Sequence, residues 1–139
     1  MRIWKTDFTL EGLNDTGHQT MVSHLGIEFT EAGDDFLVAR MPVDHRTVQP
    51  FGILHGGASV TLAETIGSVA SVLCIDLSKQ RAVGLEINAS HLKGVPSGQF
   101  VFATVRPIRL GKTIHVWNIE IRNEKGDLNC VSRLTMAII

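Results

Sequence analysis

Residues 57–77 carry the pattern that decides the fold, GASVTLAETIGSVASVLCIDL. Apolar or small residues recur in this stretch every three or four positions, at Val60, Ala63, Ile66, Gly67, Ala70, Leu73, Cys74 and Leu77. This spacing predicts one long helix over residues 57–77. Its other positions carry Ala, Ser, Thr and Val in place of Lys and Glu, so few of them are suited to face water. We therefore expect a central helix that is covered on most sides.

Strand-like segments flank this helix in the sequence. A short helix after Thr9 precedes two predicted strands, residues 27–30 and 35–41, which the turn at residues 31–34 joins into a hairpin. Four segments rich in β-branched and aromatic residues follow Arg81, at residues 82–90, 99–108, 113–122 and 128–138. Residues 123–127, NEKGD, predict a hairpin turn between the last two. No helical stretch separates these four segments, which excludes a parallel βαβ layout and favours an antiparallel meander.

A hairpin, a long apolar helix and a run of antiparallel strands together predict an α+β chain. In it, a curved antiparallel sheet wraps around one long central helix, which is the hotdog fold. A length of 139 residues fits one domain, and no repeat or linker divides the chain. We therefore expect residues 1–139 to form a single domain.

Composition excludes several classes of protein. Thirteen Lys and Arg against fourteen Asp and Glu leave a formal charge of −1, which argues against a nucleic-acid partner. The chain begins without a signal-like apolar region and lacks a run of 18 apolar residues, so no membrane association is expected. Cys74 and Cys130 show no metal-binding or disulfide pattern, and we interpret them as reduced core thiols in a cytoplasmic protein. Four histidines lack the spacing of metal ligands, so no metal site is expected. They are His18, His24, His45 and His115.

One carboxylate interrupts the apolar helix. Glu64 lies in its middle, and Ser68 follows one turn later on the same face. A carboxylate is costly to bury among apolar residues, so such a group is often retained for chemistry. The alternative is that Glu64 fills a gap between strands and pairs with an arginine.

The loop before the helix reads QPFGILHGG over residues 49–57. Its glycines allow close approach to backbone N–H groups, and a helix N-terminus carries free donors and a partial positive charge. An oxyanion hole is therefore available at Gly56 or Gly57. A plain loop-to-helix turn is the alternative, but the combination with His55, Gln49 and a carboxylate within the helix favours a site.

Helix geometry separates the two parts of this site. Gly57 and Glu64 are seven residues apart, which is about 10 Å along a helix, whereas one reacting carbon needs both groups within about 3.5 Å. Two copies with antiparallel helices would bring Glu64 of one beside Gly56 of the other. We therefore predict a homodimer with two shared sites.

Basic residues gather after the helix. Residues 81–112 contain five of them against Glu86 alone, namely Arg81, Lys93, Arg106, Arg109 and Lys112. A positive surface there would suit a small phosphorylated ligand such as coenzyme A, although scattered solvated side chains explain each residue equally well. His91 ends a predicted strand, where it lies either in the site or in a loop.

The chain resembles hotdog-fold acyl-CoA thioesterases of the phenylacetate-degradation type, and the likeness covers nearly its whole length. The motifs that carry it occupy residues 49–58, 63–68, 83–89, 91 and 132–135. Within this family, the branches that serve menaquinone synthesis and the proofreading of enterobactin synthesis are most similar. The resemblance implies a homodimer that pairs into a dimer of dimers, and no cofactor.

The same resemblance implies roles for the motif residues. Glu64 would be the nucleophile or the general base, Gly56 would polarise the thioester carbonyl with help from His55, and Gln49 and Ser68 would orient the reacting groups. The remaining expected ligand contacts fall into two groups. An acyl pocket is expected to involve Phe51, Val69, Val72 and Leu73. Coenzyme A is expected to contact Gly57, His91, Lys93, Arg109 and Lys112.

The expected reaction is hydrolysis of an aromatic or medium-chain acyl-CoA to the free acid and CoA, which needs a carboxylate, a polarising site and water. Three alternatives remain open. One is proofreading activity on acyl or aryl carrier protein, and another is a hotdog dehydratase. The last is an acyl-CoA-binding protein without turnover, against which the presence of Glu64 argues.

Overall fold

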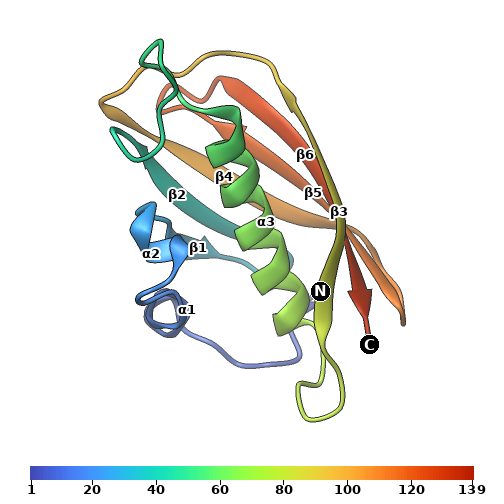
Figure 1. Cartoon of the computed structure of the whole chain (residues 1–139). Coiled ribbons are helices and arrows are strands. Elements are labelled where there is room, and N and C mark those ends of the chain that lie inside the picture. Colours follow the sequence, from blue (N-terminus) through green and yellow to red (C-terminus); the bar gives the residue numbers. More distant parts are fainter.

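A computed structural model describes all 139 residues (Figure 1). The chain forms one six-stranded antiparallel sheet, with a long helix packed across its concave face. The first elements are α1 (Leu10–Thr16), α2 (Met21–His24), β1 (Glu28–Ala32), β2 (Leu37–Val43) and α3 (Gly56–Leu73). The last four are β3 (Ala82–His91), β4 (Gln99–Leu110), β5 (Ile114–Arg122) and β6 (Leu128–Ile138). The predicted α+β class and hotdog arrangement are confirmed.

The strand order is β1-β2-β4-β5-β6-β3. The predicted hairpin of β1 and β2 is confirmed, as is the meander of β4, β5 and β6. The meander prediction is wrong for β3, which pairs with β6 and forms the far edge of the sheet. α3 and the segment that follows it carry the chain across the concave face, so β3 begins at the opposite edge from β1 (Figure 1).

Alternation along the strands supplies the core. β2 and β5 bury every second residue, which is the period-two pattern of a strand with one face covered. The buried face meets Leu62, Ala63, Ile66 and Ala70 of α3, which are fully buried. Gly67 lets the helix approach β6 closely, because a Cβ there would lie 2.5 Å from Cδ2 of Leu134.

α3 is shorter and less covered than the sequence predicts. It ends at Leu73 rather than at residue 77, because the Asp76 carboxylate accepts hydrogen bonds from the backbone N–H and hydroxyl of Ser78 and so favours a turn. α3 is long and apolar enough, by length and composition alone, to cross a membrane, and half of it is buried in this structure. Here it serves as the core helix.

Both cysteines are free and buried, as predicted. Cys74 caps the end of α3, and Cys130 lies on β6. Burial raises the pKa of the Cys74 thiol to about 11, so the thiol stays protonated at neutral pH.

Candidate active site

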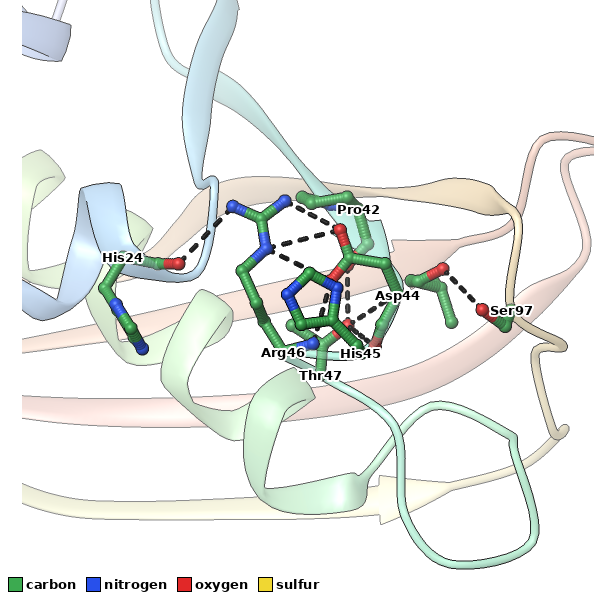
Figure 2. Close-up of polar contacts among 8 residues, drawn as sticks. His24, Pro42, Asp44, His45, Arg46, Thr47 and Ser97 are labelled. Carbon is green, nitrogen blue, oxygen red and sulfur yellow. Dashed lines mark hydrogen bonds and ion pairs between the residues drawn. The ribbon is translucent and has the colours of Figure 1, made fainter.

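A polar cluster fixes the base of the loop that leads into α3 (Figure 2). The Arg46 guanidinium pairs with the Asp44 carboxylate at 2.7 Å and also donates to the His24 carbonyl of α2. The guanidinium holds the pKa of Asp44 down at about 2. Thr47 donates its hydroxyl proton to the Pro42 carbonyl, and its own carbonyl accepts the His55 N–H at 2.8 Å. These bonds tie both ends of the loop to the end of β2.

The loop between Thr47 and His55 closes on itself. The Gln49 carboxamide oxygen accepts the Phe51 N–H, and Gly52 has a φ of +83°, a backbone conformation that favours glycine. Because this bond occupies the oxygen of Gln49, its NH₂ group is the part left to donate elsewhere. Near the end of the loop, the Leu54 N–H donates to the carbonyl of Val95, in the segment between β3 and β4.

His55 caps the N-terminus of α3. Its Nδ1 accepts the Gly57 N–H at 2.8 Å, so the other ring nitrogen, Nε2, carries the proton. The Gly56 N–H has no partner within the chain. Of the two glycines predicted for an oxyanion hole, Gly56 therefore has the free donor, whereas the N–H of Gly57 is occupied.

A cavity of about 360 Å³ opens beside the Gly56 end of α3. Two of its lining residues, Gln49 and Gly56, were predicted to be catalytic, and two others, His91 and Lys93, were predicted to contact coenzyme A. His91 packs directly on the helix start, since a Cβ at Gly56 would lie 2.8 Å from its Nε2. Sequence reasoning thus identified most of the polar groups around this cavity.

Two further polar residues of the cavity were not predicted, Ser59 and Asn129. Ser59 lies on α3, where the sequence analysis treats serine only as one of several small residues that cover the helix. Asn129 follows the predicted turn at residues 123–127 by two positions. A single Asn in a strand otherwise rich in apolar residues was the one signal that could have indicated it.

Glu64 lies outside this cavity and is exposed. The expectation of a buried carboxylate is therefore wrong for the single chain, and the alternative of an arginine partner is wrong too, since none of the ion pairs that arginines form in the chain involves Glu64. Glu64 instead faces β3, where a Cβ at Gly84 would lie 3.3 Å from its Oε2. Ser68 is half-buried, and its hydroxyl lies 3.8 Å from the Met136 sulfur.

The two parts of the predicted site thus lie against the same strand but at opposite ends of it. Glu64 is beside Gly84 near the start of β3, and Gly56 is beside His91 at its end. Within one chain the carboxylate of Glu64 is therefore separated from the N-terminus of α3, and helix geometry predicts this separation.

The predicted basic surface is divided in the single chain. Lys93 pairs with Asp127 at 2.8 Å, and Arg106 pairs with Asp35 at 3.1 Å. Arg109 and Lys112 lie at the other end of the molecule, around the β4–β5 turn. The predicted acyl-pocket residues are also separate. Phe51 is 90 % exposed at the loop tip, Val69 and Val72 are half-buried on α3, and Leu73 belongs to the core.

Comparisons with known proteins agree on one family. Residues 51–130 match the family model described as thioesterase superfamily. The chain is 56 % identical to the 1,4-dihydroxy-2-naphthoyl-CoA hydrolase of Escherichia coli over 99 % of this chain and 98 % of that protein. It is 52 % identical to the proofreading thioesterase EntH of Cronobacter turicensis, over 99 % and 98 % of the two chains.

A solved structure gives the same answer. The crystal structure of thioesterase HI1161 from Haemophilus influenzae superposes with a TM-score of 0.95, at 56 % identity, over 99 % of this chain and 94 % of that one. The chain therefore belongs to the thioesterase superfamily, as a thioester hydrolase with the hotdog fold.

Proposed function

We propose that the protein hydrolyses aryl-CoA thioesters to the free acid and CoA. The observation that carries this proposal is the unpartnered N–H of Gly56, which lies at the positive end of an 18-residue helix and opens on a cavity. Such a donor stabilises an oxygen that becomes negative during acyl transfer. The similarity to an aryl-CoA hydrolase supports an aromatic acyl group.

Groups at the cavity and at the start of α3, together with Glu64 and Ser68 further along that helix, fit each step of hydrolysis. Gly56 N–H and the protonated Nε2 of His55 polarise the thioester carbonyl, and the Gln49 NH₂ and the Ser68 hydroxyl orient the reacting groups. Glu64 either attacks the carbonyl carbon or removes a proton from the attacking water. The C–S bond then breaks, the thiolate takes up a proton, and water supplies the second oxygen of the acid. Nothing in these steps requires a metal or a cofactor.

We infer that a second copy of the chain completes each site at the β3 edge. The Leu92 N–H donates to Asn129 of β6, so alternation leaves the N–H and C=O groups of Ile87, Ala89 and His91 pointing away from β6. A second β3 can pair there in antiparallel fashion. With the two-fold axis at Asn88, Ile87 faces Ala89 of the other copy, and the bulge at Gly84–Glu86 faces its His91.

This register joins the separated parts of the site. Glu64 packs against Gly84, and Gly56 packs against His91, so pairing Gly84 with His91 across the axis brings the carboxylate of one copy to the helix N-terminus of the other. It also brings the Arg109–Lys112 turn of one copy toward Lys93 of the other, where both could hold the phosphates of CoA. Gly57, Phe51, Val69 and Val72 would then border the acyl chain along the two helices, whereas Leu73 stays in the core of its own chain.

The physiological substrate and surroundings are part of the same proposal. We place the protein in the cytoplasm, as a dimer that pairs into a dimer of dimers, and favour 1,4-dihydroxy-2-naphthoyl-CoA of menaquinone synthesis as the substrate. The similarity to EntH favours a second candidate, proofreading of misloaded aryl or acyl carrier protein. Both substrates present the thioester on the same pantetheine arm, so both would use the groups described above.

Release of free thiol tests the activity. Wild-type protein should release thiol from aryl-CoA, and Glu64→Gln should reduce kcat by at least about 100-fold, the size of effect expected for a group that acts in the transition state. Glu31→Gln is the matched control, because Glu31 is an exposed carboxylate on β1. Rates of thiol release from aliphatic acyl-CoA and from aryl carrier protein, measured in the same assay, rank the substrates. Bound substrate without thiol release in either protein would show that the chain is a binding protein.

Mixing two inactive variants tests the shared site. Glu64→Gln damages one part and Gln49→Ala the other, so a mixed dimer holds one doubly damaged site and one intact site. Random exchange should restore about a quarter of wild-type activity. No recovery, with mixed dimers demonstrated by mass spectrometry, would mean that each chain uses only its own residues.

A further inference from the structure

The floor of the cavity beside Gly56 carries polar side chains that are almost fully buried. Asn129 is 3 % exposed and Ser59 is 2 % exposed, and both line the cavity. The Oδ1 atom of Asn129 is buried and has no hydrogen-bond partner within the chain. Leaving such an acceptor unsatisfied is costly, and most buried polar groups in proteins are paired. The mechanism proposed above does not use either residue.

A β-bulge directs Asn129 toward the cavity. In the pairing of β5 with β6, Ile121 lies opposite Cys130 and Arg122 lies opposite Leu128, so Asn129 is the extra residue. Consequently Asn129 and Cys130 are both buried, although they are neighbours in a strand. The backbone of Asn129 is fixed, since its carbonyl accepts the Leu92 N–H at 2.9 Å.

The chemistry of the unpaired Oδ1 atom of Asn129 limits which groups can bind it. A carboxamide oxygen only accepts hydrogen bonds, so its partner must bring an O–H or N–H group. The thioester itself has neither, which means that the partner lies elsewhere on the ligand. Two sources lie within a few bonds of the thioester carbon, namely a hydroxyl on the acyl group and the nearest amide N–H of pantetheine.

We propose that Asn129, with Ser59 beside it, forms a subsite that accepts a hydrogen bond from an O–H or N–H donor of the bound acyl-CoA. The proposal rests on the proposed function, because it takes acyl-CoA as the occupant of this cavity. When the donor is an acyl hydroxyl, Asn129 selects hydroxylated aryl groups over plain ones. When the donor is the pantetheine amide, Asn129 contributes equally to every acyl-CoA.

Binding of non-hydrolysable ligands tests this subsite. Phenacyl-CoA and its three hydroxyphenacyl isomers have a CH₂ group between sulfur and carbonyl, so their Kd values can be measured by calorimetry. For an acyl hydroxyl donor, wild type should prefer one hydroxylated isomer by about three- to tenfold, and Asn129→Leu should abolish the preference. For a pantetheine donor, Asn129→Leu should weaken all four ligands by a similar factor. Unchanged Kd values for all four ligands would overturn the subsite.

Three controls separate this result from other causes. Asn118→Leu is the same substitution at a half-buried position of β5, on the face turned away from α3, and it should leave every Kd unchanged. Asn129→Leu removes an unsatisfied amide, so its ligand-free Tm should equal or exceed that of wild type, whereas a structural role predicts a lower Tm. Asn129→Ala repeats the test if the Leu variant does not fold.

The outcomes also distinguish the two proposals. Wild-type hydrolysis of benzoyl-CoA with unchanged ligand binding in Asn129→Leu would overturn the subsite alone. A wild-type protein that neither binds phenacyl-CoA nor hydrolyses any acyl thioester would overturn both.

Discussion

The two edges of the sheet are built differently. β1 has five residues, and Asn14 of α1 covers its outer side by accepting the Phe29 N–H at 2.7 Å and donating to the Phe29 carbonyl at 3.1 Å. β3 has ten residues, and no helix lies along its outer side (Figure 1). Val83 and Leu85 of β3 are 46 % and 60 % exposed.

This difference shows which edge a partner can use. Proteins protect sheet edges by making them short, charged or covered, and β1 has all three features, including Glu28 and Glu31. The long β3 edge carries apolar side chains and lies against both separated parts of the site. An edge with that composition is suited to pairing, which is the reason we assign the second copy to β3 rather than to β1.

Blocking the β3 edge should have the largest effect. Ala89→Pro removes an N–H that points away from β6, so the fold of each chain should survive, while pairing at the edge is lost. We expect the mass in solution to fall to half or a quarter of the wild-type value, and thiol release to fall by at least about 100-fold. Light scattering and a thiol assay measure both. Ser90→Pro is the contrasting variant, because its N–H points toward β6 and its loss should destabilise the chain itself. An Ala89→Pro protein that kept the wild-type mass and activity would contradict the assignment.

A cysteine at the proposed axis should link the two copies. Residues that face each other at a non-hydrogen-bonded position have Cα atoms about 4.5 Å apart, within the range for a disulfide. Asn88→Cys should therefore form a covalent dimer under mild oxidation, visible on a non-reducing gel. The native cysteines should not interfere, because both are buried. Ser90→Cys should stay monomeric on the gel, and a linked Ser90→Cys with an unlinked Asn88→Cys would move the axis to residue 90.

The same contrast explains what the sequence could reveal. Period and turn chemistry are local, so the sequence predicts the start of α3, the hairpin turn at residues 123–127 and the approximate position of each strand. The neighbour of β3 depends on how α3 crosses the sheet, and nothing within residues 82–91 specifies β6 over β4. The end of α3 depends on a competing side-chain turn at Asp76, which the apolar period conceals.

The candidate site divides along the same line. Gln49, His55, Gly56 and Glu64 were predicted because each belongs to a motif whose chemistry is local. Asn129 was not predicted because its burial and its place in the cavity depend on a bulge that arises only when β5, β6 and α3 are assembled. Burial of Glu64 was predicted from its apolar neighbours in the helix, but the surface that would cover it belongs to a second chain in the proposed dimer.

At the covered edge we expect an effect on stability alone. Asn14→Ala removes both hydrogen bonds to Phe29 and leaves a part-buried backbone pair without partners. The free energy of unfolding should fall by about 1–3 kcal/mol, as measured by urea denaturation. Oligomeric mass and kcat should not change, because β1 is remote from the β3 edge. The control is Asn118→Ala on β5, the same substitution at an asparagine away from both edges of the sheet. Asn123 is unsuitable as a control, because its side chain stabilises a turn. A change in mass for Asn14→Ala would show that β1 also pairs with another chain.

The smallest effect should come from the ion pair below the active-site loop (Figure 2). Because Arg46 lowers the pKa of Asp44 to about 2, Asp44 stabilises the fold above its ordinary pKa near 4 and loses that contribution as pH falls toward 2. Asp44→Asn should therefore cost about 0.5–1 kcal/mol at pH 7, where the pair is partly solvated, and almost nothing at pH 2. Urea denaturation at pH 7 and at pH 2 measures the difference. The exposed carboxylate Asp15, which forms no ion pair, gives the matched control Asp15→Asn. The pair bridges α2 to the loop of Gln49 and makes no contact with β3, so the variant should keep the oligomeric mass of the wild type. An Asp44→Asn protein that lost its dimer would show that this loop, and not only the open edge, determines the assembly.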